Sequence, residues 1–196
     1  GSMLTLRLAA ADLEARLPAG LSIAAYNAPL SCVVPGERDA VESFRQRLEA
    51  DGVGARLLQT SHAFHSAMMD PAVEPFEAEV RAIRLHAPQI PILSTLTGDW
   101  LTAAEGTDPA YWARHMRAPV AFSPGIRRLA DAGAGRIFLE VGPRGSLSTL
   151  ARQHLGTRRA APDAVPSLAD AVDAEPAALL AATALVGGVA GAALLN

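Results

Sequence analysis

The sequence has little of what marks several classes of protein. Its 196 residues include one cysteine, Cys32, so an internal disulfide framework is excluded, as is usual for proteins of a reducing cytoplasm. The sequence has 17 Lys and Arg against 20 Asp and Glu, which gives a net charge of −3. It therefore lacks the excess of positive charge that is typical of proteins that bind nucleic acid. No signal-peptide pattern opens the chain. We therefore expect a cytoplasmic location and no DNA or RNA partner.

Motifs for cofactors are absent as well. The glycine-rich turn at residues 142–145 matches neither a P-loop nor a dinucleotide fingerprint. His62 and His65 lie three residues apart, but no Cys, Asp or Glu set with zinc-like spacing accompanies them. We expect that the chain binds no metal and no cofactor of its own.

Residues 3–59 are predicted to form a small α/β unit. Strands are expected at residues 3–8, 21–26, 31–34 and 55–58, with Pro35-Gly36 ending the third. Helices are expected at residues 11–17 and 38–50, the second from the three- and four-residue spacing of Val41, Phe44 and Leu48. The resulting order is βαββαβ, the ferredoxin-like arrangement.

Residues 60–160 are predicted to form a second, larger α/β unit. The pattern favours helices at residues 70–85, 109–116, 123–132 and up to about residue 155, and strands at 92–96 and 137–141. A polar loop is expected at residues 102–108, and the strand at 137–141 is expected to be buried. Turns are expected at Gly133-Ala134-Gly135 and around Pro143.

Residues 161–196 are predicted to be a linker or tail. Residues 177–195 carry no charge, which raises the possibility of a membrane span. The run is mostly Ala and Gly with few large apolar residues, so its composition argues against a membrane helix. A linker helix that packs back on the chain is what the family resemblance described below implies, and a disordered end is the other alternative.

The junction between the two units holds the chemically informative residues. His62 and His65 stand in the run Thr60-Ser61-His62-Ala63-Phe64-His65-Ser66, between a strand-like and a helix-like segment. Each histidine could be a metal ligand, a structural residue or a general base, since the imidazole changes charge near neutral pH. Spacing alone does not choose among these roles.

Four ordered motifs resemble acyltransferase domains of type I polyketide synthases, between about residues 3 and 167. The central one is His62-Ala63-Phe64-His65-Ser66, followed by Met69. The others are YNAP at residues 26–29, YWARHMRAPVAF at residues 111–122 and FLEVGP at residues 138–143. The resemblance implies a ferredoxin-like small subdomain and the C-terminal part of an α/β-hydrolase-like large subdomain. It implies transfer of a malonyl group from malonyl-CoA to the phosphopantetheine thiol of an acyl carrier protein.

The resemblance also implies roles for single residues. His65 would be the general base that activates a serine nucleophile and later the carrier thiol. A backbone carbonyl, at the position of His115, would orient its imidazole. His62, Phe64 and Met69 would line the acyl pocket, and Phe64 would favour malonyl over methylmalonyl.

The nucleophile that the family requires is not found. Its serine stands in a G-x-S-x-G turn, and no serine here has glycine two residues before and two after. We therefore expect an inactive part of an acyltransferase, completed by a missing N-terminal half or by neighbouring synthase domains.

Two alternatives remain open. The chain could be a non-catalytic module that docks an acyl carrier protein through basic residues of the small unit, for which the candidates are Arg7, Arg16, Arg38, Arg45 and Arg47. It could instead be an independent hydrolase that uses Cys32 or a histidine, although a buried apolar role is favoured for Cys32.

Overall fold

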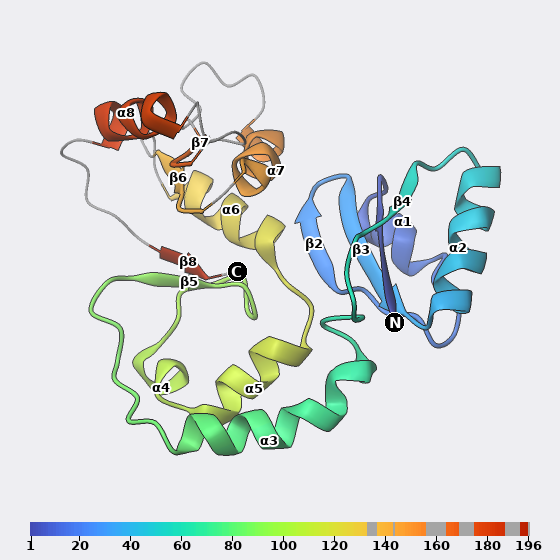
Figure 1. Ribbon diagram of the computed structural model, residues 1–196, viewed down its shortest axis with the longest axis horizontal. Coiled ribbons are helices and arrows are strands. Elements are labelled where there is room, and N and C mark those ends of the chain that lie inside the picture. The colour runs from blue at the N-terminus through green and yellow to red at the C-terminus, as the bar shows by residue number, and fades with distance from the viewer. Residues whose placement is uncertain (133–136, 143, 156–163, 169–174, 187–192, 196) are drawn as a thin grey trace. The chain divides into compact units, whose positions relative to one another are not determined.

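The computed structural model describes residues 1–132, 137–142, 144–155, 164–168, 175–186 and 193–195. They form two compact units, one of residues 1–125 with 192–196 and one of residues 126–191. Each unit contains both helices and strands, as expected for a protein of mixed α and β structure (Figure 1).

The first unit begins with the predicted βαββαβ order. Its elements are β1 (Ser2–Leu6), α1 (Ala10–Glu14), β2 (Ala25–Ala28), β3 (Ser31–Gly36), α2 (Arg38–Ala50) and β4 (Ala55–Leu57). The four strands form one sheet in the order β2-β3-β1-β4, and every neighbouring pair is antiparallel (Figure 1). The two outer strands are therefore β2 and β4.

One face of this sheet and one face of α2 share a hydrophobic core. Leu4 of β1 lies opposite Val34 of β3, so the two side chains point to the same face. Val41, Phe44 and Leu48 repeat at three- and four-residue spacing along α2, and all three belong to the same core. The residues with helical spacing in the sequence therefore form the buried face of α2.

The bounds of β3 and β2 differ from the prediction. β3 continues through Pro35 and Gly36, which pair with Met3 and Ser2 of β1. Proline is tolerated there because β2 begins opposite Val33, so Pro35 lies beyond the end of that ladder. β2 itself begins at Ala25 rather than at residue 21.

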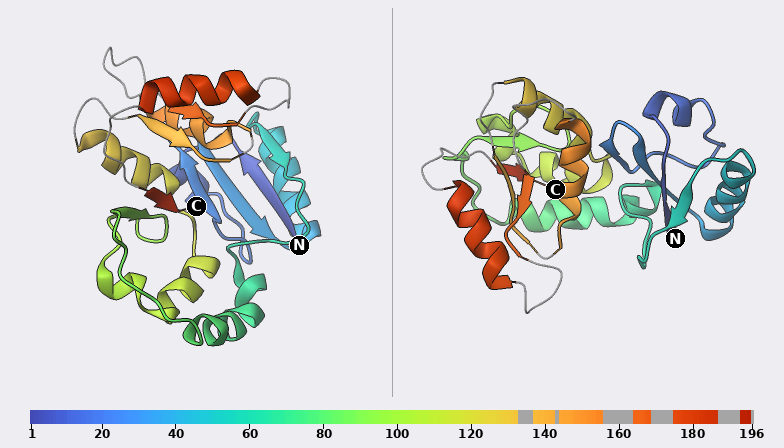
Figure 2. Two further views of the ribbon diagram at one scale, coloured as in Figure 1. Left: turned by 60° about the vertical axis from the view of Figure 1, so that its left-hand side comes forward. Right: turned by 90° about the horizontal axis from the view of Figure 1, so that it is seen from above.

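The rest of the first unit is mainly helical. It contains a 3-10 turn η1 (Ala67–Met69), α3 (Asp70–Arg81), β5 (Ile92–Ser94), α4 (Ala103–Gly106), α5 (Pro109–Arg117) and the start of α6 (Phe122–Asp131). α3 packs against α5, and β5 pairs in parallel with β8 (Ala193–Leu195) (Figure 2).

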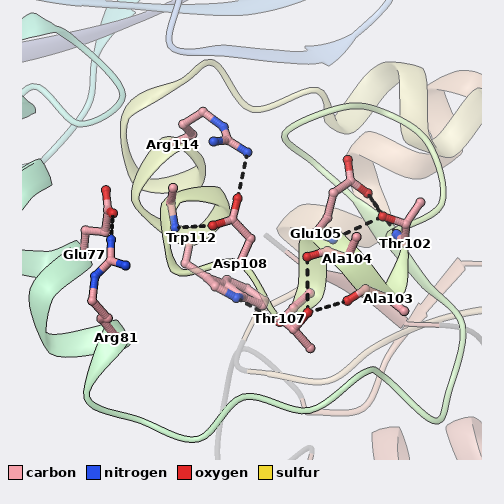
Figure 3. Close-up of polar contacts among 12 residues, drawn as sticks. Glu77, Arg81, Thr102, Ala103, Ala104, Glu105, Thr107, Asp108, Trp112 and Arg114 are labelled. Carbon is pink, nitrogen blue, oxygen red and sulfur yellow. Dashed lines mark hydrogen bonds and ion pairs between the residues drawn. The ribbon is translucent and has the colours of Figure 1, made fainter.

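The expected polar loop at residues 102–108 contains helix α4 instead. Thr102 and Glu105 form a reciprocal capping box, in which each side chain accepts from the other residue's backbone N–H, at 3.2 Å and 2.9 Å (Figure 3). Such a box supplies partners for two N–H groups that a helix start leaves unpaired. Asp108 then caps α5, and the Trp112 indole donates to the Gly106 carbonyl at 3.2 Å.

The second unit contains most of α6, then β6 (Phe138–Glu140), α7 (Ser146–Leu155), β7 (Ala164–Pro166) and α8 (Glu175–Val186). β6 and β7 are parallel. The Glu140 carboxylate accepts from the backbone N–H groups of Leu147 and Ser148, at 3.1 and 2.8 Å, and so satisfies the start of α7.

The expectation that residues 137–141 form a buried strand is wrong. Leu139 is 38% exposed and Val141 is 84% exposed. Their apolar character suits a strand covered on both faces, whereas β6 pairs with β7 in a sheet of two strands among the described residues. The predicted turns at residues 133–135 and at Pro143 lie outside the described residues.

The predicted tail contributes regular elements to both units. β7 and β8 pair with strands that lie far earlier in the sequence, and α8 is the helix expected in this region. Over the described part of the chain, no helix is both long and apolar enough to cross a membrane. The division at residue 125 does not follow the three predicted segments 3–59, 60–160 and 161–196, which stay a prediction.

Phe44→Ala should destabilise the first unit by about 3–5 kcal/mol, because it leaves a cavity in the core that α2 shares with the sheet. Phe76→Ala is the matched control, since Phe76 is also helical but 40% exposed, and it should cost less than about 1 kcal/mol. Denaturant unfolding measures both. Equal losses would contradict the assigned core.

Candidate active site

The loop that carries His65 is fixed on its C-terminal side by a serine. The Ser66 hydroxyl donates to the carbonyl of Ala63 at 2.6 Å and accepts from the N–H of Met68 at 3.2 Å. Ser66 thereby caps η1, and Asp70-Pro71 begins α3 directly afterwards. Ala63 and Ser66 are both buried, so the loop is anchored on either side of His65.

The backbone of His65 itself is in the left-handed region, with φ of 55°. Such a conformation costs a non-glycine residue about 1–2 kcal/mol, and residues held in this way cluster at functional sites. In this turn the imidazole reaches a carbonyl 53 positions later in the chain. The Nδ1 atom of His65 lies 2.8 Å from the backbone oxygen of Ala118.

The position of Ala118 explains why its carbonyl is available. α5 ends at Arg117, and Ala118 is extended, with φ of −76° and ψ of 161°. The following residue is Pro119, whose ring disfavours the helical conformation in the residue before it. The Ala118 carbonyl therefore leaves the helical hydrogen-bond ladder and can accept from a side chain.

This contact fixes the tautomer of the neutral imidazole. A carbonyl oxygen only accepts hydrogen bonds, so Nδ1 of His65 must carry the proton. The lone pair is then on Nε2. A histidine oriented in this way presents Nε2 as a proton acceptor, which is the arrangement a general base needs.

Burial shifts the proton equilibrium of His65 in the same direction. It lowers the pKa of His65 below that of an ordinary histidine, and the hydrogen bond to Ala118 opposes this shift in part. The neutral, basic form therefore predominates near neutral pH.

The expectation that His115 supplies the orienting carbonyl is wrong, because the contact is made by Ala118, three residues later. His115 lies inside the last turn of α5, before the chain leaves the helix. Its side chain is engaged elsewhere: Nε2 lies 3.1 Å from Oγ1 of Thr95. Burial, and then the charge of the nearby His65, lower the pKa of His115.

Two of the three residues expected to line the acyl pocket, His62 and Phe64, lie on the loop that carries His65. His62 is exposed, its Nδ1 is 2.7 Å from the Ser61 hydroxyl, and its ring centre is 5.9 Å from that of Phe64. Phe64 is 42% exposed. Met69 ends η1 and is partly buried. The structure brings His62 and Phe64 together.

Two sets of contacts connect the loop and α5 to the rest of the first unit. Arg117 at the end of α5 forms an ion pair with Asp70 at the start of α3. Val120 forms two backbone hydrogen bonds at the start of β2. Its carbonyl accepts from the N–H of Tyr26 at 2.9 Å, and its N–H donates to the carbonyl of Ala24, the residue before β2, at 2.8 Å. These bonds tie the segment after Ala118 to the four-stranded sheet.

Sequence reasoning missed Ala118 and Thr95. The dipeptide Ala118-Pro119 after a helical pattern is a signal for the former, since it predicts an extended residue with a free carbonyl. No local pattern marks Thr95, because its contact with His115 depends on how β5 and α5 pack.

Comparison with known proteins agrees with these motifs. Residues 1–189 match the family described as the acyl transferase domain. The chain belongs to this acyl transferase family. The expected resemblance to acyltransferase domains of polyketide synthases is confirmed, while the restriction to their C-terminal part stays a prediction.

Relatives of this acyl transferase chain are polyketide synthases. The chain is 40% identical over 162 residues to polyketide synthase GfsA of Streptomyces halstedii, a match that covers 83% of the chain and 2% of that protein. It is similar to the crystal structure of the acyltransferase domain from the second module of the salinomycin polyketide synthase. That match has a TM-score of 0.85 and 37% identity, and covers 94% of this chain and 43% of the other.

A second solved structure is similar to the same extent. It is the acyltransferase domain of SpnD in complex with 2-(pent-4-yn-1-yl)malonyl, with a TM-score of 0.86 and 35% identity. The match covers 93% of this chain and 44% of that one. The acyl transferase chain thus spans less than half of these two solved acyltransferase domains, and a far smaller share of the synthase from Streptomyces halstedii.

Cys32 of this acyl transferase chain is not poised as a nucleophile. It is buried in β3, and burial, with a smaller contribution from the charge of Glu14, raises the pKa of its thiol to about 11. The reactive form of cysteine is the thiolate, which is scarce at neutral pH when the pKa is so high. The expected apolar role of Cys32 agrees with this position.

The proposed carrier-docking arginines are partly neutralised. Arg16 pairs with Asp51 at 3.2 Å, and Arg45 lies 2.6 Å from Glu42 and 2.5 Å from Glu49. Two of the five charges are thus met by carboxylates of this chain. Among the described residues, no three His, Cys, Asp or Glu side chains gather as a metal site.

The lowered pKa values of His65 and His115 predict how stability changes with pH. Just below about pH 6.5 the unfolded chain binds more protons at these positions than the folded one, so the free energy of unfolding should rise with pH there. His65→Gln should make this rise shallower. Urea unfolding across that range measures the slope.

Val80→Ala is the control for this measurement, because it removes buried apolar atoms without a titrating group. It should lower the free energy of unfolding at every pH and leave the slope as in the wild type. A slope in His65→Gln identical to that of the wild type would contradict the burial of a neutral His65.

Proposed function

We propose that this chain is the histidine-bearing part of a polyketide synthase acyltransferase. In this proposal it loads a malonyl extender unit from malonyl-CoA onto the phosphopantetheine thiol of an acyl carrier protein, with His65 as the general base. The supporting observation is the hydrogen bond from His65 Nδ1 to the Ala118 carbonyl, which leaves Nε2 as the acceptor. The nucleophilic serine belongs to a segment outside this sequence.

In each of the two half-reactions, Nε2 of His65 takes up one proton and then gives it back. The serine hydroxyl attacks the thioester carbon of malonyl-CoA while Nε2 takes its proton. The carbon–sulfur bond then breaks, and the imidazolium gives the proton to the departing thiolate of coenzyme A. In the second half, Nε2 takes the proton of the carrier thiol, which attacks the acyl-serine ester, and the proton returns to the serine oxygen.

The Ala118 carbonyl assists both steps without exchanging a proton. A carbonyl oxygen stabilises the positive charge of imidazolium through the Nδ1–H group, which raises the basicity of Nε2. Burial acts in the opposite direction and favours the neutral form before the reaction begins. His65 can therefore accept a proton near neutral pH and release it in the next step.

Selectivity for malonyl is proposed to reside in the loop before His65. Phe64 precedes the base directly, and its ring lies beside that of His62. A bulky side chain at this place would narrow the space for a 2-methyl branch on the acyl group. One methyl group in an apolar pocket is worth about 1–3 kcal/mol, so the preference should be incomplete.

Transfer should require both this chain and a separately produced acyltransferase segment with the G-x-S-x-G serine. Intact-protein mass after incubation with malonyl-CoA should show the malonyl group on the serine segment in the mixture, and no adduct on this chain. His65→Gln should slow that acylation by about 10²–10⁴-fold, as loss of a general base does.

His86→Gln is the matched control for this experiment, because His86 is an exposed histidine outside the loop. It should acylate the serine segment at the wild-type rate. A malonyl adduct on this chain alone, or an unchanged rate with His65→Gln, would overturn the proposal.

Phe64→Ser should relax the choice between malonyl-CoA and methylmalonyl-CoA by about 10–200-fold in the ratio of kcat/KM values. Competition between the two thioesters in the reconstituted mixture, followed by mass, measures this ratio. Phe76→Ser removes a phenylalanine of similar exposure from α3 and should leave the ratio as it was. An unchanged ratio in Phe64→Ser would refute the assignment of selectivity to Phe64.

A further inference from the structure

Two consecutive residues at the end of β5 bind two side chains of α5. The hydroxyl of Ser94 bonds the hydroxyl of Tyr111, and the hydroxyl of Thr95 bonds Nε2 of His115 at 3.1 Å. Ser94, Thr95 and Tyr111 are fully or almost fully buried. Buried polar groups of this kind are costly unless they are paired, so both contacts restrict how α5 lies on β5.

The spacing of these residues fits one face of the helix. Tyr111 and His115 are four residues apart in α5 and therefore lie one above the other on the same side. Ser94 and Thr95 meet them in the same order where β5 ends. The two contacts thereby restrain α5 near both of its ends against Ser94 and Thr95.

Thr95 holds the chain at two places on either side of Ala118. Its side chain bonds His115, three residues before Ala118, and its backbone oxygen accepts from the N–H of Ala121 at 2.6 Å, three residues after. Ala118 is the midpoint of this segment. Its carbonyl is the group that orients the imidazole of His65.

We propose that Thr95 and His115 are positioning residues for the base: their side-chain hydrogen bond holds the end of α5 so that the Ala118 carbonyl fixes His65 as the Nδ1–H tautomer. The relevance of this device to acyl transfer rests on the function proposed above. The hydrogen bonds that position His65 all lie within this chain.

The electrostatics of His115 suit such a role. Burial and the neighbouring His65 both lower the pKa of His115, so it stays neutral near neutral pH. A neutral imidazole can hold Thr95 without adding a positive charge that would oppose protonation of His65. A lysine or arginine at this place would bond Thr95 but would disfavour the imidazolium form of the base.

The test is the tautomer of His65 in the isolated chain, read from the ¹⁵N chemical shifts of its two ring nitrogens. The spectra are recorded about two pH units above the ordinary histidine pKa, where the rings are neutral. Thr95→Val keeps the shape of the side chain and the backbone bond to Ala121, but removes the hydroxyl. It should raise the ratio of the Nε2–H to the Nδ1–H form of His65 several-fold, whereas Thr95→Ser should keep the wild-type ratio.

A second pair of variants addresses the other partner. His115→Leu removes the group that bonds Thr95 and should raise the same ratio. His115→Gln retains a polar atom near the position of Nε2 and should restore the ratio toward that of the wild type. If Thr95→Val does not fold, these two variants test whether the hydrogen bond between Thr95 and His115 sets the tautomer of His65.

Val41→Ala is the control for a general loss of stability, because Val41 belongs to the core of the βαββαβ part. It should lower the thermal midpoint and leave the tautomer ratio unchanged. The proposal is overturned if Thr95→Val or His115→Leu folds with a wild-type ratio, or if Val41→Ala changes the ratio as much. Because no substrate is used, this result is independent of whether the chain supports acyl transfer.

Discussion

The hydrogen bond between His65 Nδ1 and the Ala118 carbonyl is the constraint on which the arrangement of the site depends. It joins a residue in a strained left-handed turn to a carbonyl released by the end of α5. A net contribution of about 1 kcal/mol is typical for such a bond, whereas leaving a buried partner unpaired costs about 1–3 kcal/mol. The bond therefore acts mainly by favouring one relative position of the loop and α5. It disfavours every placement of the loop and of α5 in which the imidazole and the carbonyl do not meet.

Further contacts restrain both the loop of His65 and the segment around Ala118. On the loop side, Ser66 caps η1, and Asp70 pairs with Arg117 of α5. On the other side, Thr95 and the bonds from Val120 to β2 restrain the chain around Ala118. A base must be held in one orientation to be effective, and this depends on supporting contacts as much as on the imidazole itself. The function proposed for His65 follows from the combination of a fixed tautomer, partial burial and an available Nε2.

The parts of the structure set by local patterns were predictable from the sequence. The period of Val41, Phe44 and Leu48 gave the bounds of α2, and the alternation of strands and helices gave the βαββαβ order. Helix α4 was also within reach, because Thr102 and Glu105 have the spacing of a capping box. The motif around His65 pointed to the histidine for which we propose the role of base. The assignment of the orienting carbonyl to His115 was wrong, because Ala118 is the residue whose carbonyl the end of α5 frees. The pairing of β5 with β8 and the contact of Thr95 with His115 join distant parts of the chain, and no local pattern encodes them.

The most direct test of this account is a coupling across the hydrogen bond itself. In a chain with ¹⁵N-labelled histidine and ¹³C-labelled alanine carbonyls, scalar coupling between Nδ1 of His65 and the carbonyl carbon of Ala118 reports the bond without any substrate. The account predicts that His65 carries its proton on Nδ1 at neutral pH and shows this coupling. A proton on Nε2 with no coupling to Ala118 would contradict it, because the lone pair that a general base needs would then face the carbonyl.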